Sequence, residues 1–231
     1  MKNKNCVWLI CVLLSIAAMG KAQVVTLENG VGITSLRTGD FSTDKVYPYH
    51  ISLGYQYLDK GWFNLSSNVG YLRKGGQVKI DYNSIFGESS GNVILKSKLH
   101  YLTINTTFDI KKTSTDGYTF FVGVGPRIDF KLKGTDESYA DWDDLNHDYP
   151  AQKSTIKGLH PLQFGLKCVG GIRKDFGNVQ LGVNIAYLPT FTRVISGGAH
   201  DRTFTFGLSL GYKLGGNKGD VKTIRTVRHH K

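Results

Sequence analysis

Bulky apolar side chains recur at every second position over much of this chain. The pattern is clearest over residues 118–133, where the even positions run from Tyr118 to Leu132 and are apolar. Small or charged residues fill most of the odd positions, among them Arg127 and Asp129. Successive side chains of a β-strand point to opposite faces, whereas a helix would mix the two sets around its surface. The segment is therefore predicted to be a strand with one apolar and one polar face.

The same alternation in seven further segments predicts eight strands in all. Each is about as long as the 9 to 11 residues that a tilted strand needs to cross a bilayer. The predicted strands cover residues 24–36, 47–58, 62–73, 101–110, 118–133, 159–174, 179–192 and 203–214. Pro126, Pro161 and Pro189 fall inside them and predict bulges or local breaks, because proline cannot donate a ladder hydrogen bond.

The connections between these segments alternate strictly in length. Short turns are predicted at 59–61, 112–117 and 177–178, and longer polar stretches at 38–46, 81–92, 134–158 and 196–201. Outer-membrane barrels are built in this way, with short periplasmic turns at one rim and longer external loops at the other. An even number of strands then places both termini in the periplasm.

The residue types indicate which face meets lipid. A soluble lipocalin-like barrel also alternates, but its apolar face points inward and its polar face must keep it in solution. In the last predicted strand the polar face carries threonine, serine and glycine, with Lys213 as its one charge. Such small residues suit the narrow lumen of eight strands better than a solvated exterior. We therefore predict an all-β fold, an eight-stranded antiparallel up-and-down transmembrane β-barrel, with the soluble barrel as the alternative.

Several charged residues fall on the polar faces of the predicted strands. Charges enclosed in a narrow lumen must be paired and hydrogen-bonded. The pattern predicts a structural cluster in the barrel interior formed by Glu28, Asp109, Arg127, Asp129, Lys131, Lys167 and Arg173. Water-filled channels usually need about 16 strands, so a barrel plugged by its own side chains is expected.

The first 22 residues have the features of a secretory signal peptide. Lys2 and Lys4 precede an apolar stretch at 6–18, and small residues at Gly20 and Ala22 predict cleavage before residue 23. The apolar stretch has 13 residues, which is too short to span a bilayer as a helix. Residues 23–214 then form the barrel. Residues 215–231, which are rich in lysine and arginine, are predicted to be a basic flexible periplasmic tail.

Basic residues outnumber acidic ones in the chain. Once Lys2, Lys4 and Lys21 leave with the signal, 26 of the 29 basic residues remain against 18 acidic ones, a net charge of +8. The basic residues are scattered and no nucleic-acid module accompanies them, so no nucleic-acid partner is expected. The excess favours attraction to anionic outer-membrane lipid, lipopolysaccharide included.

Three segments resemble a known family, namely Leu99–Ile104, Gly123–Arg127 and Phe206–Tyr212. They are similar to the porin-type outer-membrane β-barrel domain family common in Bacteroidetes, the PorT-like group, over roughly residues 30 to 214. The resemblance implies a cell-envelope barrel. It does not imply a pore, since many members have no assigned biochemical role.

The last predicted strand also resembles the signal that the barrel-assembly machinery recognises. A polar residue, a glycine two positions later and then apolar or aromatic residues appear as Thr205, Gly207, Leu210 and Tyr212. The resemblance implies that this machinery is a partner during membrane insertion. The chain departs from the pattern because it continues beyond this strand into the basic tail.

The long stretch at 134–158 is the most distinctive polar segment. Six acidic residues crowd into positions 136–148 with aromatic neighbours. Oxygen ligands at this density suit calcium, but the helix-flanked calcium loop is not matched because Leu145 stands at a ligand position. A solvated loop that contacts an extracellular partner is the favoured interpretation, together with the stretch at 81–92.

No catalytic set can be assembled from the sequence. The five histidines of the predicted barrel, at positions 50, 100, 147, 160 and 200, have no nucleophile and orienting group in a recognisable pattern. We expect no catalytic, metal or cofactor site, and a structural or surface-interaction role through the external loops. A narrow channel for small solutes and an outer-membrane lipid-modifying enzyme are the alternatives.

Overall fold

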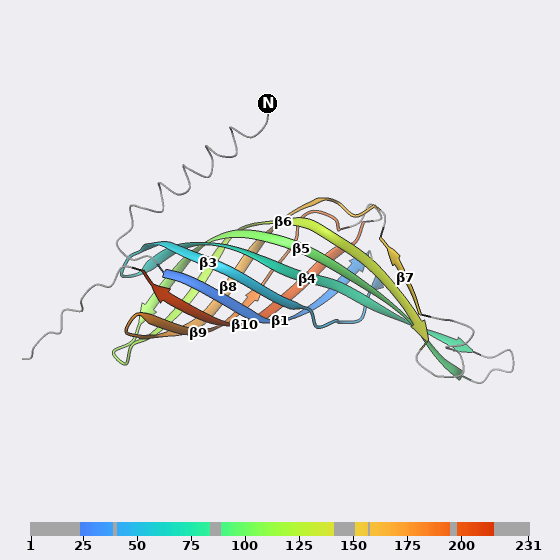
Figure 1. Ribbon diagram of the computed structural model, residues 1–231, viewed down its shortest axis with the longest axis horizontal. Helices are drawn as coiled ribbons and strands as arrows, with labels where there is room; N and C mark the ends of the chain where they lie inside the picture. Colours follow the sequence, from blue (N-terminus) through green and yellow to red (C-terminus); the bar gives the residue numbers. More distant parts are fainter. Residues whose placement is uncertain are drawn as a thin grey trace, which may run out of the picture.

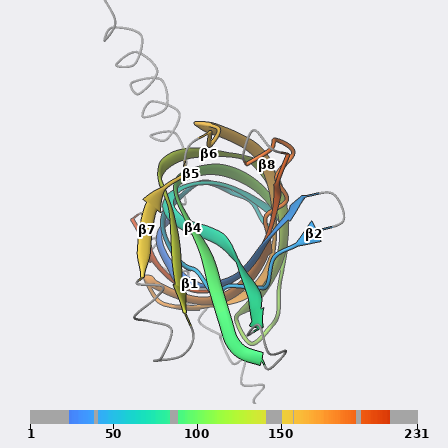
Figure 2. The ribbon, with the colours of Figure 1, turned by 90° about the vertical axis from the view of Figure 1, so that its right-hand side faces the viewer.

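The computed structural model describes residues 24–38, 41–83, 89–140, 151–156, 158–194 and 198–214. Eight of its strands close a ring in the order β1–β3–β4–β5–β6–β8–β9–β10, and β10 pairs with β1 (Figure 2). The predicted eight-stranded antiparallel barrel is thereby confirmed. Two short strands, β2 and β7, pair with β1 and β6 outside the ring. The strands are β1 Val24–Thr38, β2 Phe41–Ser42, β3 Tyr49–Asp59, β4 Phe63–Asn83, β5 Ser89–Thr113, β6 Tyr118–Ala140, β7 Gln152–Thr155, β8 Leu162–Phe176, β9 Val179–Tyr187 and β10 His200–Lys213.

The first and last strands close the ring along their whole length. Val24 pairs with Lys213 at one end of the seam, and Arg37 pairs with His200 at the other. Closure matters because an open sheet edge cannot be satisfied in lipid. Val24 and Lys213 lie at the end where β3–β4, β5–β6 and β8–β9 are joined by tight turns, hereafter the short-turn end (Figure 1). Gly117 and Gly177 have φ angles of 80° and 62° in two of these turns, a conformation that favours glycine.

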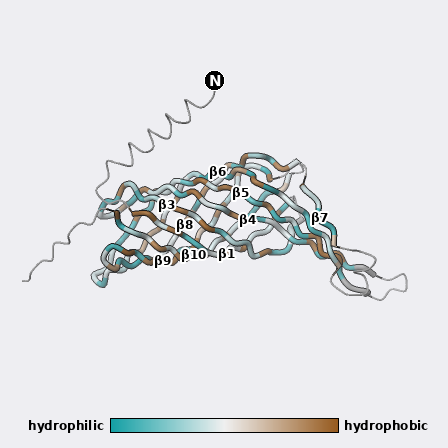
Figure 3. Tube along the Cα trace, viewed as in Figure 1, coloured by the Kyte–Doolittle hydropathy of each residue, from teal (hydrophilic) through white to brown (hydrophobic). Residues whose placement is uncertain are grey.

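The wall of the barrel separates apolar from polar side chains. Outward-facing residues are bulky and exposed, such as Val122 at 70% and Leu208 at 67%. Inward-facing residues are polar and buried, such as Asp129 and Thr203, both 0% exposed. Figure 3 shows the resulting alternation along the strands. An apolar exterior around a polar interior is the arrangement of a transmembrane barrel and the reverse of a soluble one. Among the described residues, none forms a helix long and apolar enough to cross a membrane.

Three neighbouring strands are much longer than the rest. β4, β5 and β6 have 21, 25 and 23 residues, whereas β3 has 11 and β9 has 9. At the end opposite the short turns they project beyond the ring together with β7 (Figure 1). We call this projecting part, residues 75–83, 89–98, 134–140 and 152–155, the sheet extension, and this end the long-strand end.

The sheet extension corrects two predicted loops. Parts of the stretches at 81–92 and 134–158 are strands, because the β4–β5 ladder continues to Asn83 and the β5–β6 ladder continues to Ala140. Here the strands leave the lipid, so no apolar face is required and the alternation that marks a membrane strand fades. The backbone ladder continues regardless; Lys96, for example, lies opposite Glu137. The acidic residues at 141–148 lie outside the described residues.

One of the three prolines breaks a strand as predicted, and the other two lie outside the strands. At Pro126 the β5–β6 ladder is interrupted without a change of register, which is a local break. Pro161 and Pro189 instead lie just outside β8 and β9, so the predicted strands at 159–174 and 179–192 extended too far. The register shifts place extra residues at Tyr57 in β3, at Ser90 in β5 and at Leu132 in β6.

Candidate functional site: the charged barrel interior

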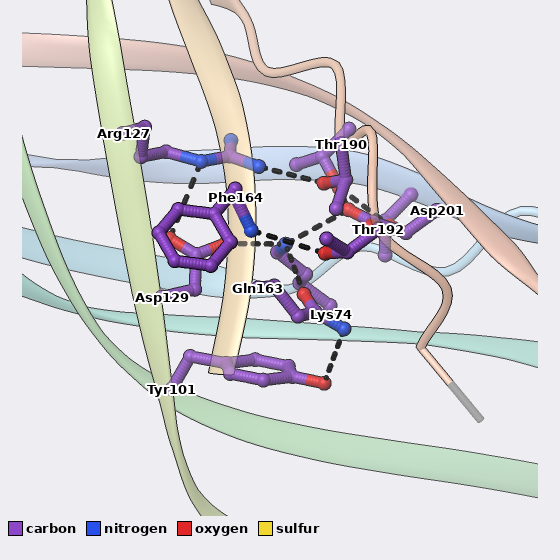
Figure 4. Close-up of polar contacts among 11 residues, drawn as sticks. Lys74, Tyr101, Arg127, Asp129, Gln163, Phe164, Thr190, Thr192 and Asp201 are labelled. Carbon is purple, nitrogen blue, oxygen red and sulfur yellow. Dashed lines mark hydrogen bonds and ion pairs between the residues drawn. The ribbon is translucent and has the colours of Figure 1, made fainter. Parts of the chain in front are cut away.

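A cluster of buried charges lies in the lumen near the long-strand end (Figure 4). Lys74 Nζ of β4 lies 2.7 Å from Asp129 Oδ2 of β6 and 2.9 Å from Asp201 Oδ2 of β10. All three side chains are almost completely buried. Neither β6 nor β10 is a neighbour of β4 in the ring, so one ammonium group ties three separated strands across the lumen.

Further polar groups complete this cluster. Arg127 Nε lies 3.2 Å from Asp129 Oδ1, and the same guanidinium donates to Thr190 Oγ1 at 2.8 Å. Lys74 also donates to Gln163 Oε1 at 3.3 Å, and Gln163 Nε2 donates to the Tyr101 hydroxyl at 3.0 Å. Two cations thus meet two carboxylates, which is the balance that charges need in a low-dielectric interior. We call Lys74, Arg127, Asp129 and Asp201 the outer charge cluster.

Buried apolar residues pack at the same end of the lumen. Leu36 pairs with Asp201 across the β1–β10 seam, and Leu99 pairs with Lys74 across β4 and β5. Leu159 and Val194, from the connections before β8 and β10, join them in one buried cluster with Tyr101. The outer charge cluster is therefore flanked by side chains that exclude water.

A second charged group occupies the middle of the barrel. Glu28 Oε1 of β1 lies 3.1 Å from His50 Nε2 of β3, and Glu28 Oε2 lies 3.6 Å from Lys167 Nζ of β8. All three residues are buried. The carboxylate thus links three strands, since β8 is not adjacent to β1 or β3.

A third group lies toward the short-turn end. Arg173 of β8 donates to Asn64 Oδ1 at 2.8 Å and to Gln56 Oε1 at 3.3 Å. Its guanidinium also lies 4.6 Å from the centre of the Phe121 ring. Asn64 Nδ2 in turn donates to Asp109 Oδ2 at 2.8 Å. Neutral amides therefore separate this arginine from the carboxylate that balances it.

Little space remains between these groups. Two internal cavities of about 60 and 30 Å³ are found in the described part of the barrel, and Glu28 and Lys167 line both. A water molecule needs roughly 10 to 15 Å³ of such volume, so the cavities suit a few waters rather than a solute. Buried Leu72, Val169, Ala186 and Leu188 fill more of the lumen.

The predicted interior residues fall into these groups, with one exception. Glu28, Asp109, Arg127, Asp129 and Lys167 are buried, and Arg173 is half-buried within the third group. Lys131 lies apart from them at the long-strand end, half-buried, and donates to the backbone carbonyl of Leu159 at 3.2 Å.

Three residues of the interior ion pairs were missed from the sequence, although strand parity points to each. His50 alternates with apolar Tyr49 and Ile51, which places it on the polar face of its strand. Lys74 lies one residue beyond a predicted strand end, and Asp201 lies two residues before a predicted strand start. Extending the alternation by one or two residues would have placed both inside the barrel.

Comparisons with known proteins give several similar solved structures and one family model. Ail of Yersinia pestis is 12% identical over 83% of this chain and 98% of its own, with a TM-score of 0.40. Neisserial surface protein A is 13% identical over 83% and 96%, with a TM-score of 0.45. A major outer membrane protein of Thermus thermophilus is 13% identical over 82% and 99%, also at 0.45. No curated protein matches the chain. The family model for the outer membrane protein beta-barrel domain matches residues 29–196, most of the chain, and the protein therefore belongs to that family.

Proposed function

We propose that this outer-membrane protein is a sealed, non-enzymatic scaffold that presents its sheet extension for surface interaction. The outer charge cluster is the observation that carries this proposal. It connects three strands of the ring across the lumen at the base of the sheet extension. A scaffold needs a rigid base more than it needs a pore.

The filled interior argues against the channel alternative. Opening a path would separate Lys74 from both carboxylates and leave charges unpaired in a low-dielectric lumen. Breaking a buried ion pair in this way typically costs about 3 to 5 kcal/mol. The internal cavities of about 60 and 30 Å³ offer no room that would offset this cost.

The interior also argues against the enzyme alternative. His50 and Glu28 form a hydrogen-bonded pair of the kind that activates nucleophiles, and Ser52 lines the same cavity. That cavity measures about 30 Å³, which cannot admit a lipid or any other substantial substrate. The pair is better explained as part of the packing of the lumen.

Strand lengths support one orientation in the membrane. The tight turns and the described ends of the chain lie at the short-turn end, which we place in the periplasm together with the basic tail. The sheet extension then projects from the cell, where the stretches at 81–92 and 134–158 contact a partner. The three resembling segments and the last strand further support membership of the PorT-like group and insertion by the barrel-assembly machinery.

Two measurements test this proposal. Purified protein in a planar bilayer should show no discrete ion-sized openings, and such openings would overturn the sealed barrel. An epitope inserted between Asn83 and Ser89 should be labelled on intact cells, whereas the same epitope inserted at Gly177 should be labelled only after permeabilisation. Labelling with the opposite pattern would overturn the orientation. A mobility shift on boiling should accompany every variant, because folded membrane barrels resist detergent until heated.

A further inference from the structure

A row of basic side chains lies where the outward apolar surface of β4, β5 and β6 ends. The last apolar residues that form a row across the three strands are Tyr71, Leu102 and Phe130, and the unpaired, exposed Leu132 follows Phe130 on β6. The next outward row is Arg73, His100 and Lys133, which are register partners. The change from apolar to basic therefore occurs at one level across three strands.

The bulge at Leu132 creates this row. His100 pairs with Lys133 and the next residue, Tyr101, pairs with Lys131, so Leu132 is the extra residue on β6. In an unbroken ladder Leu132 itself would lie opposite His100. Bulges are often placed to re-aim a side chain. Here the bulge brings a lysine rather than a leucine beside His100.

More cations lie on the same outer face of the sheet extension. Lys98 and Lys153 both form ion pairs with Glu137, at 3.2 Å in the case of Lys153. Partial burial and the positive charges of Arg73, Lys133, Lys98 and Lys153 lower the pKa of His100, which lies beyond the apolar surface. The part of this shift that comes from the four cations reflects a positive local potential. On this face the described residues place six cations, Arg73, Lys79, Lys96, Lys98, Lys133 and Lys153, against two carboxylates, Asp81 and Glu137.

The opposite rim of the barrel is arranged differently. At the short-turn end Lys111 forms an ion pair with Asp59, and Lys213 forms one with Asp175 at 2.8 Å. Lys174 lies 4.2 Å from the centre of the Tyr118 ring. The excess of cations over carboxylates is therefore greater at the long-strand end than at the short-turn end.

We propose that Arg73, His100 and Lys133, the basic row, bind the phosphate groups of a phosphorylated glycolipid in the outer leaflet. The inference rests on the proposed function, since it requires the long-strand end to face outward. The position of the basic row along the barrel supports a lipid as the source of the phosphate. The row begins where the lipid-facing side chains end, which is where headgroup phosphates lie. Arginine and lysine form strong charge-assisted hydrogen bonds with phosphate.

The neighbouring groups fit such a headgroup. The Tyr71 hydroxyl lies 2.5 Å from His100 Nδ1, and aromatic residues of this kind favour the membrane–water interface. Arg73 also donates to the carbonyl of Tyr47 at 3.4 Å, an exposed residue at the same rim. Arg73 and Lys133 are two strand spacings apart, about 10 Å. One disaccharide headgroup with two phosphates can reach both.

The test measures glycolipid retained by the full protein in nanodiscs of phosphatidylethanolamine. Each disc contains either a bis-phosphorylated lipid A or the same lipid with both phosphates removed. The wild type should retain the phosphorylated form at least about tenfold more strongly, and R73Q/K133Q should lose most of that preference. K60Q/K112Q removes the same charge from the short-turn rim and should behave as the wild type.

Each outcome bears on the proposal. Equal retention of the two lipids by the wild type, or an equal loss in K60Q/K112Q, would overturn it. Free inorganic phosphate at millimolar concentration should not displace the lipid; displacement would mean that the site binds phosphate without a lipid. K133Q changes only one exposed side chain. If the double variant does not fold, K133Q should still show a reduced preference for the phosphorylated lipid. Failure of the epitope test would instead indicate that the orientation is wrong, which separates the two proposals.

Discussion

The two ends of the barrel handle charge in opposite ways. At the long-strand end the four charges of the outer charge cluster are paired by direct ion pairs, while cations accumulate on the exterior. At the short-turn end the interior arginine is bound through neutral amides beside the larger cavity, while the exterior lysines Lys111 and Lys213 pair with carboxylates. The barrel is thus tightly closed at one end and has room for a few waters toward the other.

This difference has a physical basis. A charge buried in the lumen must find most of its partners in the protein, because bulk water cannot reach it. A charge on the exterior can instead find its partner in the surroundings, whether water or an anionic headgroup. The uncompensated exterior cations therefore indicate what lies outside the long-strand end, and the compensated interior indicates that little passes through it.

The largest expected effect comes from removing Lys74. The substitution K74M leaves Asp129 and Asp201 buried without their ammonium partner and should lower the free energy of unfolding by about 3 to 5 kcal/mol. Urea unfolding in detergent, followed by tryptophan fluorescence, measures this change. K174M, at the exposed rim, is the matched control. A loss below about 1 kcal/mol would show that the outer charge cluster does not hold the ring together.

A smaller effect is expected at the other end. R173M removes the donor to Asn64 and Gln56 and leaves the carboxylate of Asp109 without its nearby positive charge. Lost hydrogen bonds of this kind cost about 1 to 3 kcal/mol, and waters in the adjoining cavity can replace part of them. In the same urea experiment R173M should lower the free energy of unfolding by less than K74M does. The reverse order would contradict the contrast between a tightly closed end and a wetter one.

The sequence predicted the features that lipid imposes. The outer face of the barrel must be apolar where it meets lipid, whereas the lumen holds mostly small or polar side chains, so the alternation from Tyr118 to Leu132 indicated the strand and its two faces. Tight turns such as the one at Gly177 were equally visible. These signals end where the membrane ends, which is why parts of the sheet extension were predicted to be loops.

Pairing across the lumen could not be predicted in the same way. Lys74, Asp129 and Asp201 belong to strands that are not neighbours, and which residues meet depends on the tilt and register of the closed ring. Alternation specifies that a side chain points inward but not which strand it faces. Lys131 illustrates this limit, since it shares the parity of Asp129 yet binds a backbone carbonyl at the rim.

The smallest effects are expected from changing Glu137 in the sheet extension. The change should loosen the extension and strengthen the binding of glycolipid. Hydrogen bonding to Lys98 holds the pKa of this carboxyl below its usual value of 4.5, with Lys153 contributing. The stability that the ionised Glu137 carboxylate contributes is therefore complete above about pH 4.5, and it is lost as the pH falls through the lowered pKa. E137Q at neutral pH should imitate that loss and speed amide hydrogen exchange in β7 and the outer part of β6, while exchange in β1 and β10 stays unchanged.

The same substitution should strengthen binding of phosphorylated glycolipid by a few-fold, because Lys98 and Lys153 no longer share a carboxylate. D175N removes an equivalent carboxylate at the short-turn end, where Lys213 is its partner, and should leave glycolipid retention unchanged. An equal gain in D175N would mean that net charge, rather than the position of the cations, controls binding. Unchanged exchange in E137Q would mean that the ladder between β6 and β7 holds the sheet extension together without its ion pairs.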